Sequence, residues 1–551
     1  MNRFIARKIN LAHVQQSDVL LFASLLLFVF AISGCQSVGT NQPPKRKASD
    51  DNSQTSQYQQ MDKVTSNLNI LELQQLMATD KLTAQQLTKF YLKQIAIKNP
   101  ELNAVITVNP NAISIARSLD AQRAAGDVRG PLHGIPILIK DNIETQQMAT
   151  TAGSLALADN FTKRDATLVK KLKAAGAIIL GKTNLSEWAN FRSNRSSSGW
   201  SAVGGQTRNP HDMTRTACGS SSGSGAVVAA NMSVAAIGTE TNGSMTCPAS
   251  ANGIVGLKPT VGSVSRMGIV PISYTQDTAG PMTKNVTDAA IIMNAMTGVD
   301  AQDKATERLK DTPLSISIPN TTFSLAGKRI GILYSSALAH EGVNRVFEQV
   351  KQQFQNQGAI LVEGLSTHPY NGFYQDSYEV LLYEFKAGLN QYFSKLPNKN
   401  NQLTLEKIIQ FNQRNKETEM QYFLQEKFDN AQMKGPLTES QYIEALSRIK
   451  TATREQGIDK LIKDNNIDIL MTATLTPAWK IDLLNGDNYK GYFSTYPAIA
   501  GYPHLTLPMG DVHGMPVGLS FTAEAMSEQK LLNYAYVYEQ IKKEKVRTSL
   551  K

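Results

Sequence analysis

The apolar positions of the chain recur with two different periods, and each period predicts one kind of secondary structure. Between residues 68 and 95, leucine, tyrosine and isoleucine return at roughly the spacing of one face of a helix. Thr83 precedes Ala-Gln-Gln, so its hydroxyl can cap a helix start while Gln86 completes a capping box. We therefore expect helices in this part of the chain, one of them beginning just after Thr83.

Short continuous apolar runs predict buried strands farther along. Residues 134–140 form such a run and end in a lysine, and residues 177–180 form another after a helix-like segment at 167–175. Helical and strand patterns alternate up to about residue 300, and residues 328–333 open a further strand before a helix-like stretch at 343–355. This alternation predicts an α/β protein with a central sheet.

The C-terminal part has a different pattern. Residues 375–460 are polar and helix-prone with few strand signals, and strand signals return at residues 467–471 and 505–507. We therefore expect a helical insertion within the α/β fold. The chain shows no internal repeat.

The N-terminus reads as a targeting signal. Arg3, Arg7 and Lys8 precede an apolar run at residues 19–32, which is shorter than the roughly 20 residues that span a bilayer and is typical of a signal peptide. The run leads into Ile-Ser-Gly-Cys, ending at Cys35, which resembles the cleavage box of bacterial lipoproteins. Cys35 is therefore the expected lipidation site. A short anchor left uncleaved is the alternative.

This interpretation divides the chain into three parts. Residues 1–34 are the expected lipoprotein signal peptide, and residues 35–66 are polar enough to predict a disordered tether. Residues 67–547 then form the folded domain. Residue 36 is Gln rather than Asp, which favours a lipid anchor in the outer membrane of the cell envelope, facing the periplasm.

Composition narrows the function classes. With 41% hydrophobic and 19% charged residues, the chain is neither wholly disordered, nor collagen, nor a membrane protein with many spans. The formal charge is +10, but the basic residues are scattered, so we expect no nucleic-acid partner. Cys35, Cys218 and Cys247 are too few for a disulfide scaffold and lack zinc-site spacing, so we expect no metal.

Two short motifs are misleading. Residues 176–183 fit the phosphate-loop pattern G-x-x-x-x-G-K-T, but the intervening Ala-Ile-Ile-Leu favours a strand whose amides bond within a sheet. Residues 219–223 fit the G-x-S-x-G nucleophile elbow, but the preceding segment at 212–217 is not a convincing buried strand, and no downstream histidine has a distinctive context. Neither motif predicts its usual site here.

The most unusual segment is rich in small residues. Residues 216–230 read Thr-Ala-Cys-Gly-Ser-Ser-Ser-Gly-Ser-Gly-Ala-Val-Val-Ala-Ala, and the glycine-containing segments 238–248 and 253–260 follow. Small residues allow close backbone approach and supply many hydroxyl and N–H groups. A flexible linker is the alternative, but apolar segments on both sides place this run within a domain.

These segments resemble the amidase signature family, and residues 139–142 resemble that family's lysine motif. Residues 185–192 and 500–508 are similar to the branch that contains the bacterial peptide amidases. The resemblance implies that residues 67–547 form an amidase signature domain. It also implies a mixed central β-sheet sandwiched by helices, with the helical insertion around residues 375–460.

By position, the resemblance places a Ser–cis-Ser–Lys triad on Ser244, Ser220 and Lys140. Ser244 would be the nucleophile, Ser220 the bridge that follows a cis peptide bond, and Lys140 the base. A serine hydroxyl needs an adjacent base, and a lysine can serve if burial lowers its pKa toward neutrality. Taken alone, a lysine at a strand end would more often face solvent.

The resemblance also implies an oxyanion hole built from the backbone of Thr241, Asn242, Gly243 and Ser244. Many family members have glycine at the position of Asn242, and asparagine tolerates left-handed backbone angles, so we expect the loop to be retained. No motif places a histidine beside Cys218, so a catalytic thiol is not favoured. Cys247 is expected to be a packed small residue.

The function implied is hydrolysis of a carboxylic acid amide through a serine acyl-enzyme, without a cofactor. The substrate would be a small-molecule or peptide amide, with peptide C-terminal amides as one choice and esters left open. Two alternatives are the glutaminase subunit of a tRNA amidotransferase and an envelope binding protein on a disabled amidase fold. Trp188, Phe191 and residues 370–430 could form either pocket walls or core. The oligomeric state is not predicted.

Overall fold

The computed structural model describes residues 49–549, and the chain divides into two units, residues 1–64 and 65–551. The expected signal peptide and Cys35 lie outside the described residues. Within residues 49–549, no helix is both long enough and apolar enough to cross a membrane. These observations leave the N-terminal targeting signal as a prediction from the sequence.

The second half of the expected tether is helical rather than irregular. Helix α2 (Ser49–Asn67) occupies it. The segment contains neither proline nor glycine and opens Ser-Asp-Asp, which favours a helix start. A polar composition predicts exposure of a segment to water, and it does not by itself exclude helical structure.

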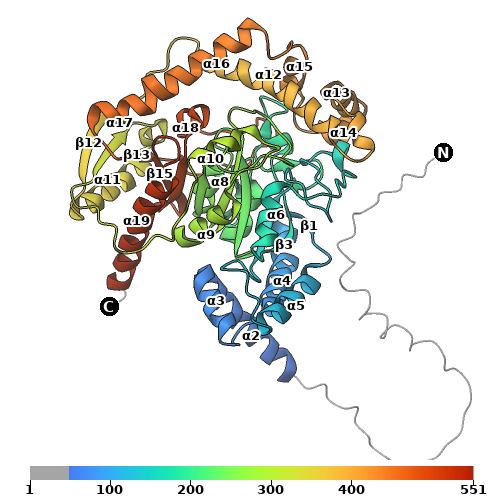
Figure 1. The fold of residues 1–551 in the computed structure, drawn as a ribbon, viewed down its shortest axis with the longest axis vertical. Coiled ribbons are helices and arrows are strands. Elements are labelled where there is room, and N and C mark those ends of the chain that lie inside the picture. The colour runs from blue at the N-terminus through green and yellow to red at the C-terminus, as the bar shows by residue number, and fades with distance from the viewer. Residues whose placement is uncertain (1–48, 550–551) are drawn as a thin grey trace, which may run out of the picture. The chain divides into compact units, whose positions relative to one another are not determined.

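The second unit is built on an 11-stranded mixed sheet (Figure 1). Its strands, in spatial order, are β1 (Val105–Val108), β3 (Ile178–Thr183), β2 (Pro136–Lys140), β8 (Ala235–Glu240), β10 (Thr278–Thr283), β9 (Val255–Lys258), β14 (His504–Val512), β15 (Met515–Thr522), β13 (Ile469–Ala473), β11 (Arg329–Leu333) and β12 (Ile360–Leu365). Strand β2 runs parallel to both of its neighbours, β3 and β8. The carboxyl ends of these three strands therefore meet at one edge of the sheet.

Helices cover the sheet in two groups. Helices α7 (Ser222–Ala229) and α8 (Thr246–Asn252) pack against each other and against the sheet, while α6 (Thr167–Ala174), α9 (Val286–Met296) and α19 (Glu528–Ser549) form a second group. The remaining helices around the sheet include α3 (Ile70–Ala78), α4 (Ala84–Leu102), α5 (Ala112–Ala124), α10 (Arg308–Asp311), α11 (Glu341–Asn356) and α18 (Thr495–Ala500). The sheet-and-helix architecture is the α/β fold expected from the sequence.

Several local predictions are confirmed. Helix α4 begins after Thr83, whose side chain accepts a hydrogen bond from Gln86 N in a complete capping box. The expected strands appear as β2, β3, β11, β13 and β14, and the expected helices beside them as α6 and α11. Residues 178–183 lie in strand β3, so their amides are used by the sheet and the phosphate-loop interpretation is excluded.

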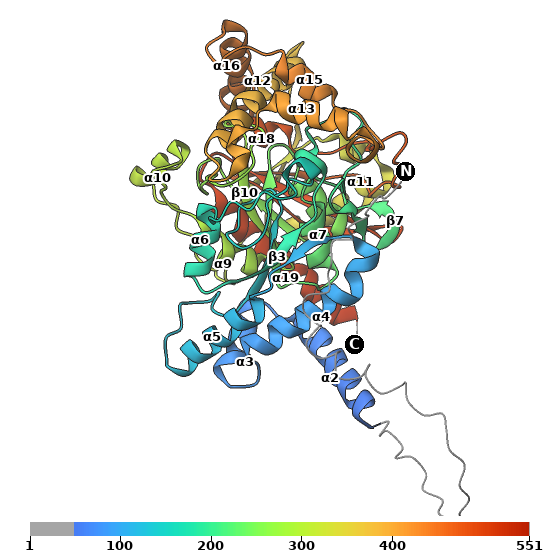
Figure 2. The ribbon, with the colours of Figure 1, turned by 90° about the vertical axis from the view of Figure 1, so that its right-hand side faces the viewer.

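The helical insertion is also confirmed. It contains α12 (Phe373–Ser394), α13 (Leu405–Arg414), α14 (Lys416–Glu419), α15 (Glu426–Gln432), α16 (Ser440–Thr453) and α17 (Asp459–Asn465). Figures 1 and 2 show α12, α13, α15 and α16 at one end of the second unit, opposite α3, α4 and α5. Trp188 and Phe191 are buried in the apolar core beneath α12, α13 and α15, so both belong to the core.

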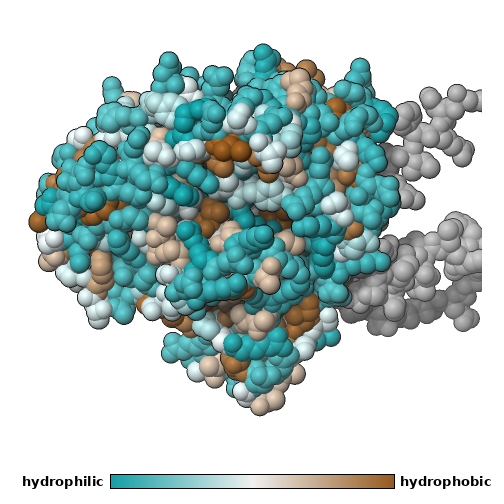
Figure 3. Space-filling model, turned by 45° about the horizontal axis from the view of Figure 1, so that its top comes forward, coloured by the Kyte–Doolittle hydropathy of each residue, from teal (hydrophilic) through white to brown (hydrophobic). Residues whose placement is uncertain are grey.

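The surface carries no large apolar face in the view of Figure 3. That view is mostly hydrophilic, with apolar side chains in small separate patches and in hollows.

Two short hairpins lie outside the main sheet, β4 (Trp200–Ser201) with β5 (Gly205–Gln206) and β6 (Arg208–Asn209) with β7 (Asp212–Thr216). Strand β7 is largely accessible, as expected for a segment that is not a buried strand.

Candidate active site

Lys140 ends strand β2 and is fully buried. Its Nζ donates hydrogen bonds to Ser220 Oγ at 2.7 Å, to Thr239 Oγ1 at 2.9 Å and to the Thr239 carbonyl at 3.3 Å. All three acceptors are neutral oxygens. Lys140 therefore has hydrogen-bond partners inside the protein, and within residues 49–549 no carboxylate forms an ion pair with its amine.

This environment changes the acidity of the lysine. Burial lowers the pKa of Lys140 from its ordinary value to about 7, and the negative charges of Asp277 and Glu240 only partly oppose that shift. Near neutral pH a substantial fraction of the amine is therefore uncharged. An uncharged amine that is hydrogen-bonded to a serine hydroxyl can accept its proton.

Ser220 lies in the small-residue segment just before α7. The peptide bond between Gly219 and Ser220 is cis, as the resemblance implied. The Ser220 carbonyl accepts a hydrogen bond from Ser186 N at 3.0 Å. Ser186 and Ser198 pack so closely on Gly219 that a side chain there would clash with them. Small residues are therefore needed to bring this loop against Lys140.

Ser244 lies in the loop between β8 and α8, next to the Ser220 loop. Its carbonyl accepts a hydrogen bond from Ser221 N at 3.0 Å, and its side chain is almost completely buried. Glu240 Oε2 accepts hydrogen bonds from Met245 N at 2.8 Å and Thr246 N at 3.0 Å. The Glu240 carboxylate thus holds the start of α8 directly after the candidate nucleophile.

The loop from Thr241 to Gly243 is held from both sides. Thr241 Oγ1 donates to Asp277 Oδ1 at 2.6 Å, and Asn242 Oδ1 accepts from Tyr492 Oη at 2.9 Å. The left-handed backbone angle falls on Gly243, with φ of 83°, so Asn242 does not need the left-handed conformation that we considered for it. The Asn242 side chain instead fastens the loop to the segment around residue 492.

One cysteine expectation is wrong. Cys247 is not simply a packed small residue, because it forms a disulfide with Cys218. Three cysteines are indeed too few for a disulfide scaffold, but that argument from number does not exclude one bond between segments that the fold brings together. The bond joins the residue before Gly219 to a residue in the first turn of α8. It also excludes Cys218 as a free catalytic thiol.

A cavity of about 160 Å³ opens beside these loops. It is lined by Gly219, Asn242, Gly243 and the disulfide, and also by Asn190, Ser198, Leu475, Trp479, Asp487, Tyr489 and Tyr492. Because Gly219 and Gly243 are the chain neighbours of Ser220 and Ser244, this cavity is the candidate substrate site. Sequence reasoning missed the lining residues between 475 and 492, because no motif marks that segment.

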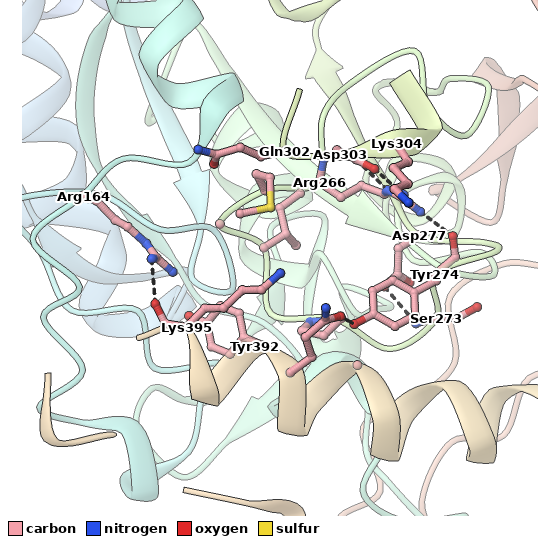
Figure 4. A pocket seen from close by; sticks show the side chains of 16 residues that line it. Arg164, Arg266, Ser273, Tyr274, Asp277, Gln302, Asp303, Lys304, Tyr392 and Lys395 are labelled. Atoms are coloured by element: carbon pink, nitrogen blue, oxygen red, sulfur yellow. Dashed lines mark hydrogen bonds and ion pairs between the residues drawn. The ribbon is translucent and has the colours of Figure 1, made fainter. Parts of the chain in front are cut away.

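A second, larger cavity of about 370 Å³ lies beside the site (Figure 4). Asp277, which binds Thr241, is in its wall, and so are Arg164 and Arg266. Arg266 Nε pairs with Asp303 at 2.8 Å, and Arg164 Nε pairs with Glu144 at 2.6 Å. Both guanidinium groups are therefore already paired with carboxylates, and the contact of this cavity wall with the site is the hydrogen bond from Thr241 to Asp277.

Comparison with known proteins agrees with this fold and identifies an amide-hydrolysing enzyme. The chain belongs to the amidase family, whose model, described as Amidase, matches residues 86–532. A probable amidase from Arabidopsis thaliana is 38% identical over 478 residues, which cover 84% of this chain and 87% of the relative.

Two further proteins are similar to most of the chain. The solved structure of native peptide amidase from Stenotrophomonas maltophilia is 44% identical with a TM-score of 0.80, covering 86% of this chain and 96% of that chain. One subunit of the glutamyl-tRNA(Gln) amidotransferase from Pseudomonas syringae pv. syringae is 32% identical and covers 86% of this chain and 97% of the relative. The protein is therefore an amidase-family enzyme with peptide amidase as a structural neighbour.

Proposed function

We propose that the protein hydrolyses linear carboxamides through a serine acyl-enzyme, with Ser244 as nucleophile, Ser220 as proton bridge and Lys140 as base. The observation that carries this proposal is the buried Lys140 amine, 2.7 Å from Ser220 Oγ, with a pKa lowered to about 7. A buried lysine without an ion pair is costly for stability, and such groups concentrate at functional sites.

The proposed reaction has two halves. Ser244 Oγ attacks the amide carbonyl, and its proton passes through Ser220 to Lys140, while backbone N–H groups of the loop from Thr241 to Ser244 stabilise the developing oxyanion. The C–N bond then breaks, and the protonated lysine returns the proton through Ser220 to the leaving nitrogen, which departs as ammonia. Water attacks the resulting ester by the same proton path, releasing the acid and free Ser244.

Peptide C-terminal amides are the proposed substrate class, since the peptide amidase neighbour covers most of the chain. Similarity to the amidotransferase relative supports a second candidate, glutamine hydrolysis. The proposed export of the chain argues against that role, which needs cytoplasmic partners. The disulfide between Cys218 and Cys247 independently supports an oxidising compartment, since such bonds are rare in the cytosol.

For location, we propose that the chain is exported, lipidated at Cys35 and anchored in the outer membrane facing the periplasm. The proposal rests on the basic N-terminus, the short apolar run and the lipoprotein-like box in the sequence. Mass spectrometry of the N-terminal peptide from membranes would show a diacylglyceryl group on Cys35. An unmodified Met1 peptide would overturn it.

The catalytic proposal is tested by ammonia release from amidated peptides, simple amides and glutamine. The purified full-length protein is compared with Ser244→Ala, Ser220→Ala and Lys140→Ala, and with Ser394→Ala on an exposed helix end as a matched control. We expect losses of at least about 1,000-fold in the three site variants and none in the control. Activity retained in Ser244→Ala would overturn the nucleophile assignment, and release from glutamine alone would favour the amidotransferase role.

A further inference from the structure

The lining of the smaller cavity contains a carboxylate that the proposed mechanism does not use. Asp487 lies in the segment between β13 and α18 and shares the cavity with Gly219 and Gly243. The proposed chemistry needs a base, a bridge, a nucleophile and backbone donors, and Asp487 is none of these. A carboxylate that lines the candidate substrate cavity therefore needs a different explanation.

The partners of Asp487 inside the protein are neutral. Its carboxylate accepts hydrogen bonds from Ser198 N at 3.0 Å, from Ser198 Oγ at 2.5 Å and from Trp479 Nε1 at 3.1 Å. Burial raises the pKa of Asp487, and these donors and the more distant Lys427 only partly offset the shift. Among the described residues, no lysine or arginine forms an ion pair with Asp487.

Lys427, whose charge acts on Asp487, also interacts electrostatically with a second carboxylate, that of Glu426. Burial lowers the pKa of Lys427 to about 8, and Glu426 opposes this shift more strongly than Asp487 does. Lys427 Nζ donates to the Asn190 carbonyl at 3.2 Å and lies over the ring of Phe191. Asp487 lines the cavity, whereas Lys427 and Glu426 are not among its lining residues, so the lysine does not neutralise Asp487 by direct contact.

Aromatic rings surround the same space. Trp479, Tyr489 and Tyr492 all line the cavity, and their rings follow one another at centroid distances of 6.0 Å and 5.8 Å. The faces of such rings attract cations, with tryptophan the strongest. A carboxylate combined with a row of aromatic rings is the chemistry that recognises an organic ammonium group.

We propose that Asp487, with Trp479, Tyr489 and Tyr492, forms a subsite that binds a cationic group of the substrate next to the scissile carboxamide. The inference rests on the proposed function and names its substrate class, carboxamides that carry an ammonium group within the same residue. That ammonium can be the free α-amino group of an amino-acid amide or the side-chain amine of a C-terminal lysine amide.

The experiment compares three amides of similar size with the full-length protein at pH 7. Acetyl-norleucinamide is neutral, acetyl-lysinamide adds a side-chain ammonium, and norleucinamide adds an α-ammonium. We expect kcat/KM for one of the cationic amides to exceed that of acetyl-norleucinamide by about tenfold, mostly through KM, as expected for one partly solvated cation contact. The cationic amide that shows the higher kcat/KM identifies whether the ammonium is an α-amino group or a side-chain amine. Equal values for all three would overturn the subsite.

The role of the carboxylate is tested by Asp487→Asn, which removes the charge and keeps an oxygen that can accept from Ser198 and Trp479. The matched control is Asp482→Asn, an equal charge change in the same segment, where the side chain accepts from Leu484 N and Asn485 N. We expect the ratio of kcat/KM for the preferred cationic amide to kcat/KM for acetyl-norleucinamide to fall to about one in Asp487→Asn. The same ratio should remain at the value of the unaltered protein in Asp482→Asn. An unchanged ratio in Asp487→Asn would overturn the proposal.

A binding measurement separates this proposal from the catalytic one. Calorimetry with Ser244→Ala gives the affinity ratio of the same three amides without turnover. A preference for a cationic amide in binding, without hydrolysis by the unaltered protein, would contradict the proposed function and retain the subsite. Hydrolysis of all three amides without any preference would retain the proposed function and contradict the subsite.

Discussion

The carboxyl ends of two neighbouring strands, β2 and β3, each hold a buried lysine, and the two lysines have different partners. Lys140 on β2 and Lys182 on β3 are both fully buried. Lys182 Nζ lies 3.0 Å from Asp141 Oδ1 and also donates to Thr150 Oγ1 at 3.1 Å. In the described part of the chain, the hydrogen-bond partners of Lys140 are the neutral oxygens of Ser220 and Thr239. The same residue type at the same depth is therefore ion-paired in one strand and unpaired in the next.

The difference teaches what makes a buried lysine available as a base. Burial lowers the pKa of both lysines, but for Lys182 the carboxylate of Asp141 opposes the shift through direct contact. For Lys140 the opposing charges are Asp277 and Glu240, which act without an ion pair to its amine. Asp277 Oδ1 accepts a hydrogen bond from Thr241 Oγ1, and Glu240 Oε2 accepts one from Met245 N at the start of α8. We infer that the ion-paired Lys182 stabilises the fold, whereas the amine of Lys140, which is hydrogen-bonded to neutral oxygens, is available for proton transfer.

The largest expected effect comes from replacing each lysine with methionine. Lys140→Met removes the proposed base, so ammonia release should fall at least about 1,000-fold with only a small change in unfolding free energy. Lys182→Met leaves Asp141 buried without its partner and should lower the free energy of unfolding by about 3–5 kcal/mol. Urea denaturation and ammonia assays on both variants measure the two quantities. Equal loss of stability in both variants would break the distinction between base and support.

The pH dependence of activity sharpens the comparison further. The pKa of Lys140 is lowered to about 7, and only the uncharged amine can accept a proton. Below pH 7, kcat/KM should therefore fall by about tenfold per pH unit, and above pH 7 it should level off. A pH–rate profile between pH 5 and 9 in constant ionic strength measures this limb. An acid limb centred near pH 4 would assign the titrating base to a carboxylate instead.

The disulfide between Cys218 and Cys247 affects the loops that face Lys140 and not the partners of Lys182. The two cysteines are 29 residues apart, so replacing both with alanine should cost about 2–4 kcal/mol of unfolding free energy. Because the bond joins the Ser220 and Ser244 loops, kcat should also fall, while KM changes less. Treatment of the native protein with dithiothreitol serves as the control, and full kcat in the double variant would show that packing alone positions the loops.

The smallest effects are expected from the hydroxyl partners of the two lysines. Thr239→Val removes one acceptor from Lys140 and also the acceptor of Asn142 Nδ2, and it should lower kcat several-fold. Thr150→Val removes an acceptor from Lys182 and should cost about 1 kcal/mol of stability with little change in kcat. Steady-state kinetics and thermal unfolding of the pair separate the two expectations. The reverse pattern, with kcat lost in Thr150→Val, would show that Lys182 takes part in the reaction.

Much of the fold could be predicted from local sequence. The capping box at Thr83, the strands of residues 134–140 and 177–180 and the helical insertion depend on neighbouring residues, and these features appear where expected. The helix α2 was missed because polar composition reports exposure and not backbone conformation. The disulfide was missed because cysteines 29 residues apart in sequence give no local signal of their contact.

The candidate site, like the fold, was predicted only in part from the sequence. The resemblance placed Lys140, Ser220 and Ser244 on segments that the structure brings together, with the cis bond before Ser220. The wall that contains Asp487 and Trp479 has no motif, because cavity walls are built from segments whose only shared property is their position in the fold.

By itself, the sequence determined which segments become strands and helices, since backbone preferences and apolar periodicity act over a few residues. It also places Lys140 at the end of one short apolar run and Lys182 shortly after another. Only the tertiary structure decided which lysine would be paired. Asp141 follows Lys140 in the chain, yet its carboxylate contacts Lys182 on the next strand, while Lys140 contacts Ser220, which is 80 residues away. A lysine's pKa depends on the charges and oxygens within a few ångströms of its amine, and long-range folding selects those neighbours.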